Sequence, residues 1–258
     1  MTAIVGIRCR DGIVIGADSS ATFGDGRTLR TIEQQTAHKL DIIDDKLIVA
    51  GTGYVGHQQR FCEVARQLWN GKKLSGASPI GAAKLLAQAG ITDFGQTVPA
   101  ANLANGIQYH ALVAYPAGGQ LCLCELPGQL GFQPEVKQPD DLWFASAGSG
   151  QPITDPFLAM LREVFWHDGP PNVQGGVFTA YWALKHACDL NPGGIKEPID
   201  IAVLEFTKGQ LGARKLAKEE LDEHANVVGD AKLHLRSFRD VLEGKGASAP
   251  PKPPKGGT

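Results

Sequence analysis

The grouping of apolar runs along the chain is the feature that most constrains its fold. Short runs typical of strands come in groups, and longer runs with helical spacing come in pairs, in the order strands, two helices, strands, two helices, strand. Groups segregated in this way indicate α+β layers rather than alternating βαβ units. The expected strands span residues 2–9, 13–18, 39–43, 47–50, 109–115, 120–126 and 199–206, with a further strand inside 142–150, and the expected helices span 56–69, 79–94, 153–166 and 175–190.

The composition excludes several classes of protein. Hydrophobic residues make up 43% of the 258, which is enough for a sizeable core, and the net charge of −2 argues against nucleic-acid binding. No apolar run approaches the roughly 18 residues of a membrane helix. The five cysteines form no C-x-x-C motif, and the N-terminus lacks the pattern of a signal peptide. We therefore expect a cytoplasmic protein with no metal site, no cofactor and no membrane or nucleic-acid partner.

The character of the chain changes near its C-terminal end. One folded domain is expected over residues 1–207, followed by an extension over residues 208–258. Apolar residues at helical spacing predict an amphipathic helix over 231–242, and the closing "GASAPPKPPKGGT" has the low complexity of an extended or disordered tail. The extension holds ten Lys/Arg against seven Asp/Glu, so it is basic beside an acidic core.

A G-x-G-x-x-G spacing, formed by Gly51, Gly53 and Gly56, follows a strand-like run. A dinucleotide site would also need a second parallel strand and an acidic residue about 20 positions further on. No acidic residue lies between Glu63 and Asp93, and the helix is followed by another helix. Two interpretations remain: a tight strand-to-helix turn, or backbone amides that stabilise an anion such as a reaction oxyanion.

The N-terminus carries a candidate nucleophile. Met1 precedes Thr2, and an initiator Met is usually trimmed before a small residue. A threonine hydroxyl needs a nearby base, and a free α-amine on Thr2, with a pKa of about 7.7–8.0, would supply one. A turn at residues 10–11 pairs residues 2 and 19, so that Asp18 lies beside Thr2. Lys39 begins the next hairpin and would lower the pKa of the hydroxyl or carry its proton.

Three parts of the sequence, namely Thr2, "GIVIGADSSAT" and "HKLDII…LIVAGTG", resemble β-type subunits of the proteasome core particle. They are also similar to the peptidase subunit of the bacterial heat-shock protease that shares this fold. Both are N-terminal nucleophile hydrolases. The resemblance runs from Thr2 to about Phe206 and implies an α+β fold, a four-layer αββα sandwich, as in a bacterial proteasome homologue.

Position by position, the resemblance makes Thr2 the nucleophile, Asp18 the buried carboxylate and Lys39 the lysine, with His38 as the neighbouring alternative for the lysine. It makes Gly53 the donor of the oxyanion amide, with Gly51 as the alternative.

The loop "AGSG" matches the one whose serine supports the α-amine, which is Ser149, and "ACDLNPGG" supplies the supporting aspartate, Asp189. The sequence departs from the family at Pro192, where a serine is common. The pocket for the side chain before the scissile bond is expected to be apolar and roomy, and its expected lining residues are Ala21, Ala37, Gly51 and Val55.

The function that this resemblance implies is a threonine endopeptidase in a self-compartmentalised ring protease. Its implied partners are copies of itself in stacked rings of six or seven subunits, peptides or unfolded proteins as substrates, and an ATPase or other activator ring. Two alternatives stay open. One is a non-catalytic ring subunit, a scaffold or gate, that keeps Met1 and so lacks a free amine on Thr2. The other is an N-terminal nucleophile amidase acting on one small substrate.

Overall fold

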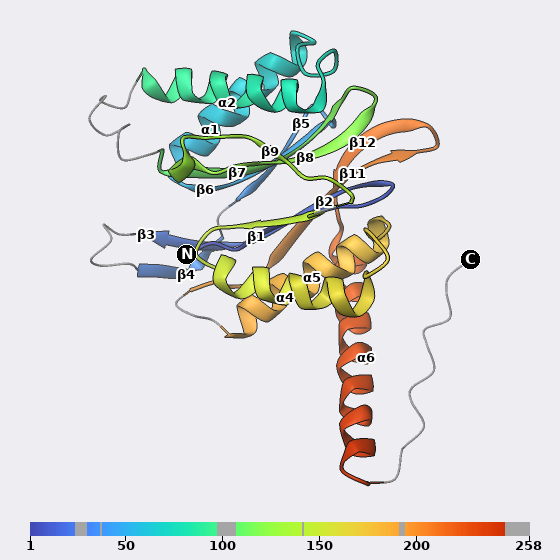
Figure 1. The fold of residues 1–258 in the computed structure, drawn as a ribbon. Helices are drawn as coiled ribbons and strands as arrows, with labels where there is room; N and C mark the ends of the chain where they lie inside the picture. Colours follow the sequence, from blue (N-terminus) through green and yellow to red (C-terminus); the bar gives the residue numbers. More distant parts are fainter. Residues whose placement is uncertain (24–29, 37, 97–106, 141, 191–193, 246–258) are drawn as a thin grey trace. The chain divides into compact units, whose positions relative to one another are not determined.

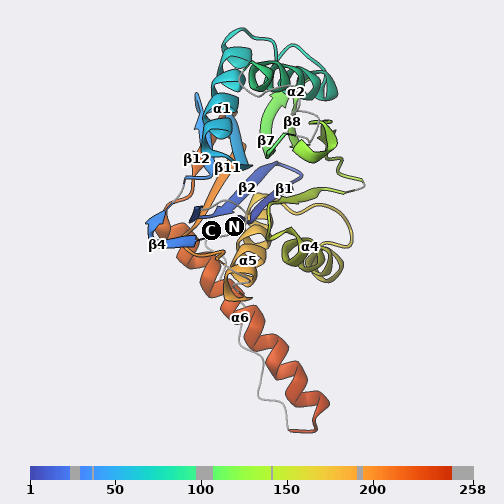
Figure 2. The ribbon, with the colours of Figure 1, turned by 90° about the vertical axis from the view of Figure 1, so that its left-hand side faces the viewer.

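Two five-stranded antiparallel sheets, stacked face to face, form the centre of the structure (Figure 1). The structure is a computed structural model, and it describes residues 1–23, 30–36, 38–96, 107–140, 142–190 and 194–245. The first sheet has the strand order β10-β1-β2-β11-β12, and the second has the order β5-β6-β7-β8-β9. Helices α1 (Val55–Asn70) and α2 (Pro79–Gly95) cover the second sheet, and α4 (Gln151–Phe165) and α5 (Val173–Leu190) cover the first (Figures 1 and 2). The predicted four-layer αββα sandwich is confirmed.

In the first sheet, β1 (Ile4–Arg8) and β2 (Gly12–Asp18) form the hairpin on which the expected site depends. Ile4 pairs with Ala17 and Arg8 with Ile13, which is the register predicted from a turn at residues 10–11. Every residue of β2 is buried, because α5 covers one face of this strand and the second sheet covers the other. The remaining strands are β10 (Phe144–Ala147), β11 (Ile199–Thr207) and β12 (Gln210–Lys215).

The second sheet consists of β5 (Leu40–Ile43), β6 (Leu47–Gly53), β7 (Tyr109–Ala117), β8 (Gln120–Leu126) and β9 (Glu135–Val136). Its side chains alternate between two cores, as the pleat of a sheet requires. Leu47 and Val49 join the core beneath α1 and α2. Ile48 and Ala50 join the core between the sheets, where they meet Ile15 of the first sheet. Since both faces of the sheet are covered, these strands read as continuous apolar runs in the sequence.

Several elements of the structure, including β9, were not expected. Strands β3 (Ser20–Phe23) and β4 (Arg30–Thr36) pair in the stretch between the first two hairpins, and a short 3-10 helix, η1 (Gly128–Leu130), follows β8. Another unexpected strand is β12, which pairs with β11 through residues 202–207. The first compact unit therefore runs from Met1 to Leu216 rather than ending at residue 207, because the chain turns back and extends the sheet.

The second compact unit, Ala217–Thr258, contains one described helix, α6 (Lys218–Leu242). The helix includes the expected segment 231–242 and begins 13 residues earlier, at Lys218. Glu219 and Glu220 lie in its first turn, where negative charge favours a helix, and Glu220 accepts a hydrogen bond from the Ala217 N–H (2.9 Å). The early start was missed because charged and polar residues outnumber the apolar ones in residues 218–230, where the apolar residues are Leu221, Ala225, Val227 and Val228.

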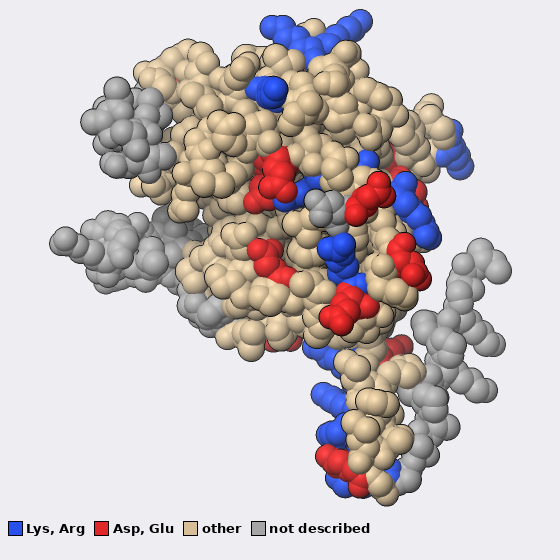
Figure 3. Space-filling model, viewed as in Figure 1, with Lys and Arg blue, Asp and Glu red and all other residues tan. Residues whose placement is uncertain are grey.

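Two observations concern the surface charge and the apolar character of the helices. On the face shown in Figure 3, acidic and basic side chains of the described residues are interspersed. Among the helices that the structure describes, none combines the length and apolar character needed to cross a membrane.

The core between the sheets predicts a large stability cost for truncation at Leu123. This side chain is fully buried there, and both of its methyl groups come within 3.2 Å of the position that a Cβ on Gly6 would take. Leu123→Ala should lower the free energy of unfolding by about 2–5 kcal/mol, because the cavity cannot close. Leu190→Ala, at a position that is 57% exposed, is the matched control and should change it by about 0.5 kcal/mol or less. Urea unfolding measures both, and equal losses would contradict the assignment of the core.

Candidate active site at the N-terminus

The backbone of Thr2 is held by the loop that follows β10. The Thr2 N–H donates to Ser149 Oγ (3.0 Å), and the Thr2 carbonyl accepts from the Gly150 N–H (2.9 Å). Gly148 has a φ of +94°, and a Cβ at this position would lie 2.3 Å from the Thr2 carbonyl oxygen. Only glycine permits this approach. The "AGSG" loop is therefore shaped to place the Ser149 hydroxyl on the nitrogen of Thr2.

Next to Thr2, the carboxylate of Asp18 is completely buried and accepts four hydrogen bonds. Its Oδ1 accepts from the Ala3 N–H (2.8 Å) and from Lys39 Nζ (2.7 Å). Its Oδ2 accepts from the Ser20 N–H (3.2 Å) and from the Ser20 hydroxyl. A buried carboxylate is tolerated only when it is paired and hydrogen-bonded, and this one is both.

The ammonium of Lys39 forms the other half of the buried pair. Its side chain is 8% exposed, and its Nζ also donates to the Met1 carbonyl (3.2 Å) and to Ser20 Oγ (3.4 Å). Burial lowers the pKa of Lys39 below its ordinary value, and the charge of Asp18 opposes this only in part. His38 is exposed, whereas Lys39 is buried against Asp18, so the geometry favours Lys39 of the two alternatives. The peptide bond between Met1 and Thr2 thus lies directly against a buried cation.

The glycine-rich end of β6 contains two candidate donors for an oxyanion, the backbone amides of Gly51 and Gly53. The Gly51 N–H donates to the Lys39 carbonyl (3.1 Å), so the sheet already uses it. Amides two residues apart on a strand point the same way, and the Gly53 N–H therefore points past the beginning of β5, on the side where Lys39 lies. Gly53 has a φ of +126°. Of the two alternatives for an oxyanion donor, the geometry favours Gly53.

A buried polar network supports this end of β6 from behind. Gln58 of α1 donates to Asp41 Oδ2 (2.7 Å) and accepts from the Tyr109 hydroxyl (2.5 Å). A Cβ on Gly51 would lie 2.1 Å from Gln58 Oε1, so only glycine leaves room for the amide. Gly56, in contrast, has open space around it. The three glycines therefore do not form one ligand-binding motif, and β6 pairs antiparallel with both of its neighbours, unlike a strand of a dinucleotide-binding unit.

Hydrogen bonds connect four of the expected site residues. Thr2, Asp18, Lys39 and Ser149 are linked by direct hydrogen bonds to side chains or to the Met1–Thr2 backbone. Asp189, near the end of α5, forms an ion pair with Lys185 one turn away. The side chain of Cys188 lies near Asp18, and burial raises the pKa of its thiol to about 12.

The expected pocket before the scissile bond is described only in part. Val55, at the start of α1, is 69% exposed. Ala37 lies outside the described residues, and Ala21 is in β3 with its side chain outside them.

Two contributors to the site were missed at the sequence level. Ser20 bonds both Asp18 and Lys39, and its place in "ADSS" directly after the buried strand is the one signal that could have indicated it. The amide of Gly150 was missed because a backbone donor leaves no trace in the residue types.

The N-terminal third of the chain is similar to proteasome subunits. A family model described as "Proteasome subunit" matches residues 2–93. A proteasome subunit beta of Nanoarchaeum equitans is 33% identical over 66 residues, which are 26% of this chain and 31% of that protein. A proteasome subunit beta 1 of Thermococcus gammatolerans is 44% identical over 55 residues, 21% of this chain and 25% of that protein. The matched part of the chain thus covers a third or less of the length of these two relatives.

A longer match joins the chain to another kind of proteasome subunit. A proteasome subunit alpha 2 of Haloarcula marismortui is 27% identical over 224 residues, 86% of this chain and 81% of that protein. A solved structure of an Anbu (Gly-1) mutant from Hyphomicrobium sp. strain MC1 superposes with a TM-score of 0.65 at 15% identity, and covers 94% of this chain and all of that one. The fold is thus a sandwich of the N-terminal nucleophile hydrolase type, and the similarities support a proteasome-like family.

The buried pair predicts strong coupling between Asp18 and Lys39. Lys39→Met leaves an uncompensated buried carboxylate and should lower the free energy of unfolding by about 3–5 kcal/mol. Asp18→Asn combined with Lys39→Met should cost less than the two single changes together, with a coupling energy of about 0.5–3 kcal/mol. Urea unfolding of all four proteins gives the cycle. Lys218→Met, on an exposed pair with Asp222, is the control and should have no measurable effect. Additive costs at Asp18 and Lys39 would show that the pair does not interact.

Proposed function

We propose that this chain is a threonine peptidase subunit of a ring-forming, self-compartmentalised protease, with Thr2 as its nucleophile after Met1 is removed. One observation carries the proposal. The nitrogen of Thr2 is held on the Ser149 hydroxyl, while the buried Lys39–Asp18 pair lies against the peptide bond that precedes Thr2. A hydroxyl, a nitrogen that becomes a free amine and a neighbouring cation are the parts that an N-terminal nucleophile needs.

In the proposed reaction, the Thr2 hydroxyl gives its proton to the α-amine as Oγ attacks the carbonyl carbon of the substrate. Lys39 favours the developing alkoxide electrostatically, and Asp18 holds Lys39 in place. The carbonyl oxygen becomes an oxyanion, which the Gly53 N–H stabilises. The α-ammonium then returns the proton to the leaving amine, and the C–N bond breaks. Water, deprotonated by the α-amine, hydrolyses the remaining ester and releases the acid and free Thr2.

The assembly and the environment follow from the same proposal. We expect copies of this chain to form stacked rings of six or seven subunits in the cytoplasm of a bacterium. Peptides or unfolded proteins are the expected substrates, and an ATPase or other activator ring is the expected partner. Asp189 is proposed to support the amine side of the site. The pocket before the scissile bond is proposed to take apolar side chains, because its residues Ala21, Ala37, Gly51 and Val55 are small or uncharged.

A non-catalytic ring subunit is the second candidate, and two observations favour it. The long match to an alpha-type subunit is one. The other is that Met1, when retained, accepts a hydrogen bond from Lys39 with its carbonyl and leaves Thr2 without a free amine. Intact mass of the purified chain separates the two, since loss of one Met residue supports the enzyme and its retention supports the scaffold. A small-substrate amidase differs from both in size, and a monomer or dimer in solution would favour it.

The nucleophile is tested by substitution at Thr2. Thr2→Ala removes the attacking oxygen and should reduce hydrolysis of fluorogenic peptides to background. Thr2→Ser, which keeps a hydroxyl, should retain measurable activity. Undiminished turnover by Thr2→Ala would contradict the assignment of the nucleophile.

The proposed pocket predicts the substrate preference. Wild-type turnover should be fastest on peptides with an apolar residue before the scissile bond, and strong preference for acidic or basic residues there would contradict the proposed pocket.

Helix α6 is proposed to take part in assembly. Its second half exposes Leu233, Leu235, Phe238 and Val241, each at 46% or more, and an isolated amphipathic helix is marginal in water. In a ring, the nearest surface that could bury these side chains is a neighbouring subunit.

Deleting the chain after Leu216 should therefore weaken the rings or open the chamber to large substrates, and leave cleavage of short peptides intact. Leu233→Glu combined with Phe238→Glu tests the apolar face with the chain at full length. Size-exclusion mass and cleavage of an unfolded protein measure the effect. If both variants keep wild-type mass and rates, α6 has no role in assembly.

A further inference from the structure

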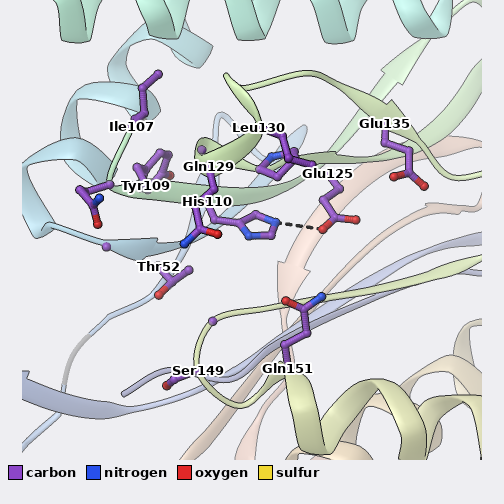
Figure 4. A pocket seen from close by; sticks show the side chains of 15 residues that line it. Thr52, Ile107, Tyr109, His110, Glu125, Gln129, Leu130, Glu135, Ser149 and Gln151 are labelled. Atoms are coloured by element: carbon purple, nitrogen blue, oxygen red, sulfur yellow. Dashed lines mark hydrogen bonds and ion pairs between the residues drawn. The ribbon is translucent and has the colours of Figure 1, made fainter. Parts of the chain in front are cut away.

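A cavity of about 600 Å³ opens beside the N-terminal site, and its described lining includes none of the residues expected for the apolar pocket (Figure 4). Thr52, Gly53 and Ser149 line one end of this cavity. The ends of β7 and β8, the helix η1 and the first residue of β9 line the rest. Its volume lies within the range of about 300–1,000 Å³ that is usual for ligand pockets.

The far part of the cavity contains a hydrogen-bonded chain of ionisable side chains. Glu125 Oε1 is 3.0 Å from His110 Nε2, and Glu125 Oε2 is 2.8 Å from Lys137 Nζ. Lys137 also pairs with Glu135 Oε1 at 2.6 Å. Glu125 and Glu135 face each other across β8 and β9, where like charges repel unless a cation lies between them. Lys137 is that cation, and its side chain is only 3% exposed.

The charge that this cluster presents to the cavity is negative. Both carboxylates line the cavity, while Lys137 lies behind them. Burial raises the pKa of Glu125, but hydrogen bonds from His110 and Lys137 outweigh burial and leave this pKa below its ordinary value. Burial lowers the pKa of Lys137, and its bonds to Glu125 and Glu135 outweigh that effect in the same way. Two carboxylates around one ammonium leave one negative charge, and Glu135, at 60% exposure, is open to a ligand.

Neutral hydrogen-bond acceptors line other parts of the cavity, including the part next to residues 148–151. Gln151 points into the cavity opposite His110 and Glu125 (Figure 4). Its Nε2 donates to Asp155 Oδ2 (3.0 Å), which leaves its Oε1 to accept from a ligand. Gln129 lines the cavity from η1. None of the described residues that line the cavity is Lys or Arg, so Lys137 behind the two carboxylates is the cation with which a ligand would share them.

The position of Ser149 decides which part of a substrate would enter. In the proposed reaction, the α-amine of Thr2 returns a proton to the leaving amine, so the leaving group must lie on the side of that amine. The nitrogen of Thr2 is held by Ser149, and Gly148, Ser149 and Gln151 form one wall of the cavity. The Gly53 amide, at the same end of the cavity, points toward the side of Lys39, which does not line the cavity. The cavity thus lies where the residue after the scissile bond would be.

We propose that this cavity binds the basic side chain, Lys or Arg, of the substrate residue that directly follows the scissile bond. This inference rests on the proposed peptidase function. The ammonium or guanidinium would pair with Glu135 and lie against Glu125, with Gln151 Oε1 as a further acceptor. Ring protease activity would then combine an apolar preference before the scissile bond with a basic preference after it.

The test uses the full-length protein with Met1 removed and a series of internally quenched peptides. The peptides differ only in the residue after the scissile bond, which is Arg, Lys, citrulline, norleucine or Glu. Citrulline has the shape of Arg without its charge. Because a hydrogen bond to a charged group is worth more than a neutral one, kcat/KM for Arg should exceed that for citrulline by about tenfold or more. Equal rates for Arg and citrulline, or a preference for norleucine or Glu, would overturn the proposal.

Two variants connect this preference to the cavity. Glu135→Gln, at an exposed position, and Glu125→Gln should each reduce the ratio of Arg to citrulline toward one. Glu163→Gln, on an exposed part of α4 away from the cavity, is the matched control and should keep the wild-type ratio. The ratio compares two peptides on the same variant, so a general loss of activity leaves it unchanged, and the control Glu163→Gln should also cleave coumarin amides at the wild-type rate. An unchanged ratio in Glu135→Gln and Glu125→Gln would also overturn the proposal.

A failure of the proposed function gives a different result. If the wild-type protein cleaves neither the coumarin amides nor any of the peptides, the peptidase assignment fails. The cavity is then tested by binding alone, with fluorescence anisotropy of the Arg and citrulline peptides on Thr2→Ala. Binding of the Arg peptide that is about tenfold tighter, and lost in Thr2→Ala combined with Glu135→Gln, supports a site for basic side chains. Equal binding of the two peptides overturns it.

Discussion

The buried ion pair between Asp18 and Lys39 is the interaction on which the rest of the site depends. Asp18 ends a strand of the first sheet, and Lys39 directly precedes a strand of the second. Their 2.7 Å contact therefore joins the two sheets at the point where the N-terminus enters the fold. Each charge would be costly to bury alone, so the pair ties the register of one sheet to that of the other. The same contact places an ammonium group against the Met1–Thr2 peptide bond.

Around this pair, two glycines allow other groups to approach their Cα atoms closely. Gly148 brings the 148–150 loop onto the Thr2 carbonyl, and Gly51 lets Gln58 and Tyr109 pack directly beneath the turn at Gly53. Both contacts are closed to any residue with a Cβ. The result is a rigid frame in which the nitrogen of Thr2, the Gly53 amide and the Lys39 ammonium have defined directions before any substrate binds, as preorganised catalysis requires.

The two main candidate roles, a threonine peptidase and a non-catalytic ring subunit, differ in whether the peptide bond between Met1 and Thr2 is present. With Met1 in place, the Thr2 nitrogen is an amide that donates to Ser149 and has no lone pair to accept a proton. Without Met1, the same nitrogen is an amine in a partly buried position next to a cation. The surroundings already lower the pKa of the terminal amine that Met1 carries, through burial and then through the charge of Lys39. A site that favours a neutral amine suits a general base, which supports the proposed enzyme.

Much of the fold could be predicted from the sequence, because burial of one or both faces of a strand or helix requires a recognisable pattern of apolar residues. The order of elements, the register of the β1–β2 hairpin and the proximity of Asp18 to the chain start all followed from local spacing. The β3–β4 pair, β12 and the first half of α6 did not, because polar and charged residues outnumber their few apolar positions. Strand β12, one of these elements, extends the first compact unit to Leu216.

By itself, the sequence determined the layered α+β architecture and the presence of a threonine beside a carboxylate and a lysine. Only the tertiary structure decided that Lys39, rather than His38, reaches Asp18, and that the Gly51 amide is already used by the sheet. Only the tertiary structure brought His110, Glu125, Glu135 and Lys137 together beside Ser149, because three different strands supply the ionisable chain. The reason is physical. Apolar periodicity in the sequence indicates which face of a helix or strand is buried. The direction of a backbone amide and the charge that lines a cavity depend instead on residues that are distant in the chain.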